Sequence, residues 1–157
     1  LAELQNRISS LSNEVRELSH RLHPSILEDL GLAAALRSLV EDFQERHDLH
    51  VHLQIEEIPS PLPLAVATAL YRITQEALRN VVQHAGEEAL VTLVVSHAPG
   101  TLRLIIHDTG RGFDPKTIRV NDGVGILSME ERARQVGGSL KIETHGHGTT
   151  VTVVAPR

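Results

Sequence analysis

The 157-residue sequence contains no cysteine and no tryptophan, and aromatic residues make up only 2% of it. The lack of cysteine excludes a disulfide framework and a thiolate metal site. Because aromatics are scarce, a core must be built from leucine, valine, isoleucine and alanine, and the hydrophobic content of 41% is sufficient for that. The length corresponds to about one domain with a substantial core.

Basic blocks and long apolar runs are also absent. The formal net charge is −5, which argues against nucleic acid as a partner. No apolar run reaches membrane-spanning length and no signal peptide opens the sequence, so we expect a cytoplasmic location and no membrane contact by this stretch. Because the sequence starts at Leu1 without methionine, we interpret it as a piece of a longer chain, whose membrane anchoring stays open.

The first 23 residues show the heptad spacing of a helix that packs against another helix. The apolar positions alternate at steps of four and three: Leu4, Ile8, Leu11, Val15, Leu18 and Leu22. Pro24 ends this pattern. We therefore expect an N-terminal helix that requires a partner helix.

Helical and strand patterns alternate in the rest of the chain. The spacing predicts helices over 32–47 and 63–85 and a third between Gly125 and Gly137. It predicts strands over 51–56, 89–96, 102–108, 139–145 and 149–155. Strands joined by hairpins, with helices between them, are typical of an α+β two-layer sandwich in which helices cover one face of a mixed sheet. No P-loop and no G-x-G-x-x-G after the first strand are present, which argues against Walker and Rossmann sites.

The helix predicted over 63–85 carries Glu76, Asn80 and His84 at a four-residue spacing, which places them nearly in line on one side. Glu76 and Asn80 fall at the border between its apolar and polar sides. Carboxylate and amide oxygens suit Mg²⁺, which substrate phosphates usually help to coordinate. An ordinary amphipathic helix explains the same pattern.

The stretch DTGRGF follows the strand predicted over 102–108. Asp108, at the end of that strand, presents acceptors for the exocyclic amine of a purine base. Gly110 and Gly112 allow backbone to approach a planar ligand. A tight turn that leaves a strand is the simpler alternative.

Two later glycine motifs likewise allow two interpretations, a ligand-binding site or an ordinary turn. Gly123 and Gly125 precede a predicted helix, whose free N–H groups suit a phosphate. Gly148 and Thr149 lie in a predicted hairpin and add a glycine with a neighbouring hydroxyl. A loop hinge and a plain hairpin turn are the respective alternatives.

The order of the four motifs is specific: EALRNVVQHA, DTGRGF, GVGILSMEER and GHGTTVTV. They closely resemble the N box and glycine boxes of the ATP-binding domain of sensor histidine kinases, in the superfamily of gyrase, Hsp90 and MutL. Residues 18–43 resemble the junction between dimerisation helix and ATP-binding domain in the nitrate-sensor-like subfamily. The resemblance implies a Bergerat-type fold, with the dimerisation helix and junction over 1–30 and the catalytic domain over 31–157.

The resemblance also implies roles for individual residues. Asn80 matches the asparagine that ligates the Mg²⁺ on the ATP phosphates, and Glu76 matches the acidic residue that positions metal or water. Gly123 and Gly125 match the phosphate-side glycines at the end of a lid over 111–124.

The base side of the site follows in the same way. Asp108 matches the aspartate that binds the adenine amino group, Gly110 and Gly112 lie beside the base, and Thr149 backs the pocket.

One position departs from the family pattern. Gln83 stands where many kinases of this group have a lysine, so a cationic phosphate contact is absent there. We expect His84, Arg79 or the lid residue Arg111 to take its place, and ATP binding to be weakened rather than abolished.

The implied activity is that of a protein-histidine kinase. ATP–Mg²⁺ would phosphorylate a histidine on the dimerisation helices of the intact homodimer, and a response regulator would accept the phosphoryl group. His20 and His23 are followed by Arg21 and Pro24 rather than by an acidic residue, so the acceptor is expected upstream. We therefore expect this stretch to bind ATP without autophosphorylation. A serine kinase or ATP hydrolase on the same fold, and a non-enzymatic nucleotide-gated interaction module, are the alternatives.

Overall fold

The computed structural model describes residues 25–86, 88–112 and 120–157, so the predicted heptad helix and half of the predicted lid, residues 113–119, lie outside the described residues. The described elements follow in this order: α2 (Ser25–His47), β1 (His50–Ile55), α3 (Leu64–Asn80), η1 (Val81–Ala85), β2 (Leu90–Ala98), β3 (Thr101–Asp108), α4 (Val120–Gln135), β4 (Ser139–His145) and β5 (Gly148–Pro156). No helix in these ranges is both long and apolar enough to cross a membrane.

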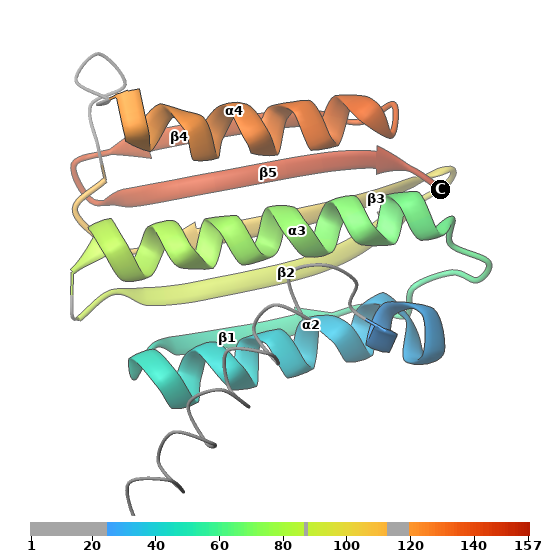
Figure 1. The fold of residues 1–157 in the computed structure, drawn as a ribbon, viewed down its shortest axis with the longest axis horizontal. Coiled ribbons are helices and arrows are strands. Elements are labelled where there is room, and N and C mark those ends of the chain that lie inside the picture. Colours follow the sequence, from blue (N-terminus) through green and yellow to red (C-terminus); the bar gives the residue numbers. More distant parts are fainter. Residues whose placement is uncertain (1–24, 87, 113–119) are drawn as a thin grey trace, which may run out of the picture.

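The five strands form one mixed sheet in the order β1-β2-β3-β5-β4. β1 pairs with β2 in parallel, and the other three pairings are antiparallel. Helices α2, α3 and α4 all lie on one face of this sheet (Figure 1). The predicted α+β two-layer architecture is therefore confirmed.

The core lies between the sheet and the three helices. Alternate residues of the central strands point into it, so that Leu93 and Leu104 are completely buried while Arg103 is exposed. From α3, Leu70 and Ile73 are buried against the sheet. Burial of one such aliphatic side chain stabilises the fold by roughly 1.5–3 kcal/mol, and this stripe therefore holds α3 across the middle of the sheet.

The last turn of the central helix differs from the prediction. α3 ends at Asn80, and Val81–Ala85 continue as a π-helical turn, η1, which ends at Gly86 with φ of 98°. Helical spacing alone does not distinguish an α-helical turn from a π-helical turn, because in both the apolar residues continue along the same side of the helix. Single π-turns inside α-helices are frequent at functional sites.

Two helix starts also differ. α2 begins at Ser25, seven residues before the prediction, and is interrupted at Gly31, which has non-helical φ of 82°. α4 begins at Val120, so Gly123 and Gly125 lie within its first turns rather than in a loop before it. Asn, Asp and Gly are weak helix formers, and the sequence therefore predicted loop where the fold has helix.

Candidate nucleotide site

The four predicted motifs meet at one end of the sheet. The end of α3 with η1, the end of β3, the start of α4 and the turn between β4 and β5 all lie at the left of Figure 1. Residues that are up to about seventy positions apart in the sequence are therefore neighbours at this end, which we call the glycine-lined end.

The polar border of α3 faces the start of α4. A Cβ atom on Gly125 would lie 2.5 Å from Glu76 Oε1 and 3.7 Å from Asn80 Oδ1. Both side chains are partly buried, and the Glu76 side chain is 24% exposed. A carboxylate and an amide oxygen thus converge on a position that carries no side chain, a donor set that fits Mg²⁺.

The other oxygen of Glu76 is held by Arg79. Arg79 Nη1 donates to Glu76 Oε2 at 2.7 Å, in a pair one helical turn apart. The Arg79 side chain is 42% exposed, and so the pair is partly screened by water. The main consequence of this contact is orientation, because it leaves Oε1 toward Gly125.

Asp108 ends β3 as one of two buried polar residues in the described chain, with 7% exposure. Its Oδ1 accepts a hydrogen bond from the Gly110 amide at 2.8 Å, which closes the turn. In the β3–β5 register Asp108 stands directly opposite Thr149, whose Oγ1 lies 3.5 Å from Thr144 Oγ1. A buried, oriented carboxylate beside a hydroxyl fits recognition of an amino-substituted base.

Close backbone contacts hold this turn against η1 and β5. A Cβ on Gly110 would lie 2.4 Å from Ala85 Cβ and 2.7 Å from its carbonyl oxygen, and the Arg111 amide donates to that oxygen at 3.2 Å. A Cβ on Gly148, which has φ of 137°, would lie 2.0 Å from the Asp108 carbonyl oxygen. Only glycine fits either position without movement of backbone.

Ala85 was not predicted to have a role. It is the last residue of η1, is buried, and forms the surface on which Gly110 rests. The nearest signal in the sequence is a small residue directly before Gly86, at the end of a predicted helix. That signal is too common to assign a contact.

The remaining predicted residues occupy the edges of the glycine-lined end. Gly112 has φ of 64°, and Gly123 lies in the first turn of α4. His84 is exposed on η1. The structure thus brings together Glu76, Asn80 and Gly125 on one side, and Asp108, Gly110 and Thr149 on the other.

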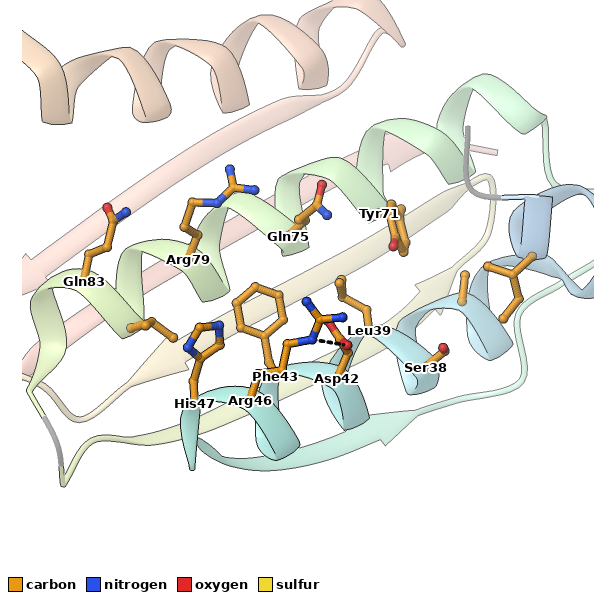
Figure 2. A pocket seen from close by; sticks show the side chains of 13 residues that line it. Ser38, Leu39, Asp42, Phe43, Arg46, His47, Tyr71, Gln75, Arg79 and Gln83 are labelled. Atoms are coloured by element: carbon orange, nitrogen blue, oxygen red, sulfur yellow. Dashed lines mark ion pairs between the residues drawn. The ribbon is translucent and has the colours of Figure 1, made fainter. Parts of the chain in front are cut away.

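Arg79, His84 and Arg111 are the residues considered in place of a lysine at position 83, and His84 is exposed on η1. Gln83 and Arg79 both line a groove between α2 and α3 (Figure 2). The Arg111 guanidinium lies beside Gly86, with Nε 3.6 Å from the position of a Cβ there. Arg79 contacts the proposed metal-binding oxygens directly, with its Nη1 atom 2.7 Å from Glu76 Oε2.

A family profile agrees with this geometry. The profile described as histidine kinase-, DNA gyrase B-, and HSP90-like ATPase matches residues 65–157. The chain belongs to this ATPase family. All of the residues discussed at the glycine-lined end fall inside the matched range.

Individual relatives of this ATPase-family chain are histidine kinases. Sensor histidine kinase MctS of Rhizobium johnstonii is 38% identical over 146 residues, which are 92% of the chain and 32% of MctS. The chain therefore spans about a third of this curated relative.

Solved structures of the Erythrobacter litoralis EL346 blue-light activated histidine kinase are also similar. Its histidine kinase domain has a TM-score of 0.66 and 26% identity, with 80% of the chain and 60% of the domain covered. A longer structure of the same kinase has a TM-score of 0.72 and 24% identity, and the match covers 96% of this chain and 49% of that structure.

Proposed function

We propose that the chain is the ATP–Mg²⁺-binding catalytic domain of a sensor histidine kinase. The observation that carries this proposal is the meeting of buried Asp108 with the Glu76–Asn80 pair at the glycine-lined end. The family match supports nucleotide as the ligand, and the kinase relatives support phosphoryl transfer rather than simple hydrolysis.

Each group of residues has one task in this proposal. Asp108 accepts from the exocyclic amine of adenine, and its orientation is maintained by the Gly110 amide. Asn80 and Glu76 would hold Mg²⁺, which when bound supplies positive charge to the ATP phosphates. Gly125 leaves room for the Glu76 carboxylate because it has no side chain. Phosphoryl transfer depends mainly on such positioning and charge stabilisation.

In the longer protein, the γ-phosphoryl group of ATP passes to a histidine on the upstream dimerisation hairpin. The bond between the γ-phosphorus and the bridging oxygen breaks, a phosphorus–nitrogen bond forms, and ADP leaves. A response regulator then accepts the phosphoryl group on an aspartate. Dimerisation through the upstream helices and a cytoplasmic position belong to the same proposal.

Calorimetric titration of ATP and ADP, with and without Mg²⁺, tests the nucleotide site. We expect Asp108→Asn to weaken binding of both nucleotides by roughly 10- to 100-fold, since one buried hydrogen-bond mismatch costs about 1–3 kcal/mol. We expect Asn80→Ala to remove the Mg²⁺ dependence and leave Mg²⁺-free binding of ADP unchanged. Nucleotide binding that neither substitution changes would refute the assignment.

Phosphotransfer to a separately supplied dimerisation hairpin tests the reaction. Acid-labile phosphohistidine on the hairpin is expected, with none on this chain alone. Acid-stable phosphoserine would instead identify a serine kinase on the same fold. Nucleotide binding without Mg²⁺ dependence and without transfer would identify a nucleotide-gated interaction module.

A further inference from the structure

Thr109 fastens the turn that follows β3 to the start of β2. The Thr109 amide donates to the Leu90 carbonyl oxygen at 3.0 Å, and the Leu90 amide donates to Thr109 Oγ1, also at 3.0 Å. The two residues therefore form a closed pair of hydrogen bonds, one position beyond the Val91–Asp108 pair of the β2–β3 register. The nucleotide proposal gives Thr109 no task.

The Thr109 hydroxyl stands where a regular sheet uses a carbonyl oxygen. In a hydrogen-bonded antiparallel pair, two residues exchange amide-to-carbonyl bonds in both directions. Here a side chain satisfies the Leu90 amide, so the main chain can leave the ladder at Thr109 without losing this bond. The chain then turns toward η1, where the Arg111 amide donates to the Ala85 carbonyl oxygen at 3.2 Å.

The orientation of the Asp108 carboxylate depends on where this turn lies. The Gly110 amide donates to Asp108 Oδ1 at 2.8 Å, so a shift of Gly110 also moves the carboxylate. Gly110 is placed by its close contact with Ala85 and by Thr109, the residue that joins it to Asp108. Thr109 is exposed and its hydroxyl is engaged by Leu90, whereas Asp108 is buried. Thr109 therefore acts on the carboxylate through the main chain.

We propose that Thr109 is a positioning residue for recognition of the adenine amino group. By holding the exit of β3 on Leu90, its hydroxyl keeps the Gly110 amide in the place from which it orients Asp108. This inference rests on the proposed nucleotide site and names the group that sets its selectivity for an amino-substituted base. Hydrogen bonds weaken steeply as their angle departs from linearity, so a rotated carboxylate loses this selectivity before other nucleotide contacts are lost.

Two nucleotides separate this role from a general effect on the fold. ATP carries the exocyclic amine, and purine riboside triphosphate lacks it. We expect the unsubstituted chain to bind ATP roughly 10- to 100-fold more tightly than the analogue, which leaves the buried Asp108 carboxylate without its partner. In Thr109→Val we expect ATP to bind roughly three- to tenfold more weakly and the analogue nearly as before, so that the ratio of the two affinities falls. Calorimetric titration measures both affinities.

Two further variants identify the hydroxyl as the group responsible. Thr109→Ser keeps the hydroxyl and should keep the affinity ratio. Thr101→Val is the matched control, because Thr101 begins β3 at the end far from Asp108, and it should leave the ratio unchanged. Deuterium exchange of the Leu90 amide gives a measurement without nucleotide, and we expect faster exchange in Thr109→Val than in Thr109→Ser. Because Thr109 is exposed, we expect the chain to fold in both variants.

The possible outcomes distinguish the role of Thr109 from the nucleotide site itself. An unchanged affinity ratio in Thr109→Val, equal weakening of both nucleotides, or the same loss in Thr109→Ser would overturn the positioning role and leave the nucleotide site in place. Equal binding of the two nucleotides by the unsubstituted chain, or binding of neither, would refute the amine contact of Asp108 and the role of Thr109 with it.

Discussion

The glycine-lined end and the α2–α3 groove are built in opposite ways. At the glycine-lined end, backbone touches backbone, as where Gly110 rests on Ala85 and Gly148 on the Asp108 carbonyl. In the groove, large side chains such as Phe43 and Tyr71 line an open space. The difference implies that one added methyl group is harmful at the first region, whereas the exposed rim of the second has room for small changes of shape.

The largest expected effect in this comparison comes from Gly148→Ala. The new Cβ would lie 2.0 Å from the Asp108 carbonyl oxygen at a φ of 137°, so β5 must shift relative to β3. We expect the free energy of unfolding to fall by roughly 2–5 kcal/mol, from backbone strain together with overpacking. Thermal or urea denaturation measures this loss, and weaker ATP binding should accompany it.

Gly146→Ala is the matched control for that substitution. Gly146 lies in the same β4–β5 turn, and a Cβ there would meet nothing within 4 Å. We expect a change within about 0.5 kcal/mol, as for an ordinary surface substitution. Equal destabilisation by the two alanines would show that the turn as a whole, rather than the contact with Asp108, limits this region.

A smaller effect is expected where the two regions touch, at Arg79. Arg79 lines the groove and also holds Glu76 Oε2 at 2.7 Å. In Arg79→Gln the carboxylate of Glu76 loses the contact that orients it, and we expect half-maximal ATP binding at a Mg²⁺ concentration higher by a few-fold. We expect a stability loss of less than about 1 kcal/mol, because the pair is partly exposed.

Two variants separate a positioning role from a general charge effect. Arg79→Lys keeps the positive charge and should restore most of the original Mg²⁺ dependence. Arg134→Gln removes an arginine from the exposed pair with Glu131 on α4, away from the groove, and should leave the dependence unchanged. An identical shift in Arg134→Gln would mean that only net charge matters.

At the glycine-lined end, sequence periodicity predicted the helix side that carries Glu76 and Asn80 but not the start of α4, and it did not predict the groove. The four-residue spacing of Glu76 and Asn80 predicted a shared helix side, and the structure places both toward Gly125. The α2–α3 groove has no such signal, because Phe43 and Tyr71 are twenty-eight positions apart and meet only through tertiary packing. The π-turn at η1 was missed for a related reason, since hydrogen-bond register within a helix is not visible in side-chain spacing.

The smallest expected effect is a pH dependence of the free energy of unfolding that comes from Tyr71 in the groove. Burial, with a further contribution from the negative charge of Asp42, raises the pKa of Tyr71, while Arg72 opposes the shift. The native state therefore keeps the phenolic proton at a pH where the unfolded chain, with an ordinary pKa of roughly 10, has lost it. Stability from this group is complete below about pH 10 and decreases as the pH rises through the raised pKa. Tyr71→Phe should flatten that alkaline part of the unfolding curve and leave stability at neutral pH nearly unchanged. If the alkaline loss persisted in Tyr71→Phe, it would come from another group, and the groove would contain no buried titrating phenol.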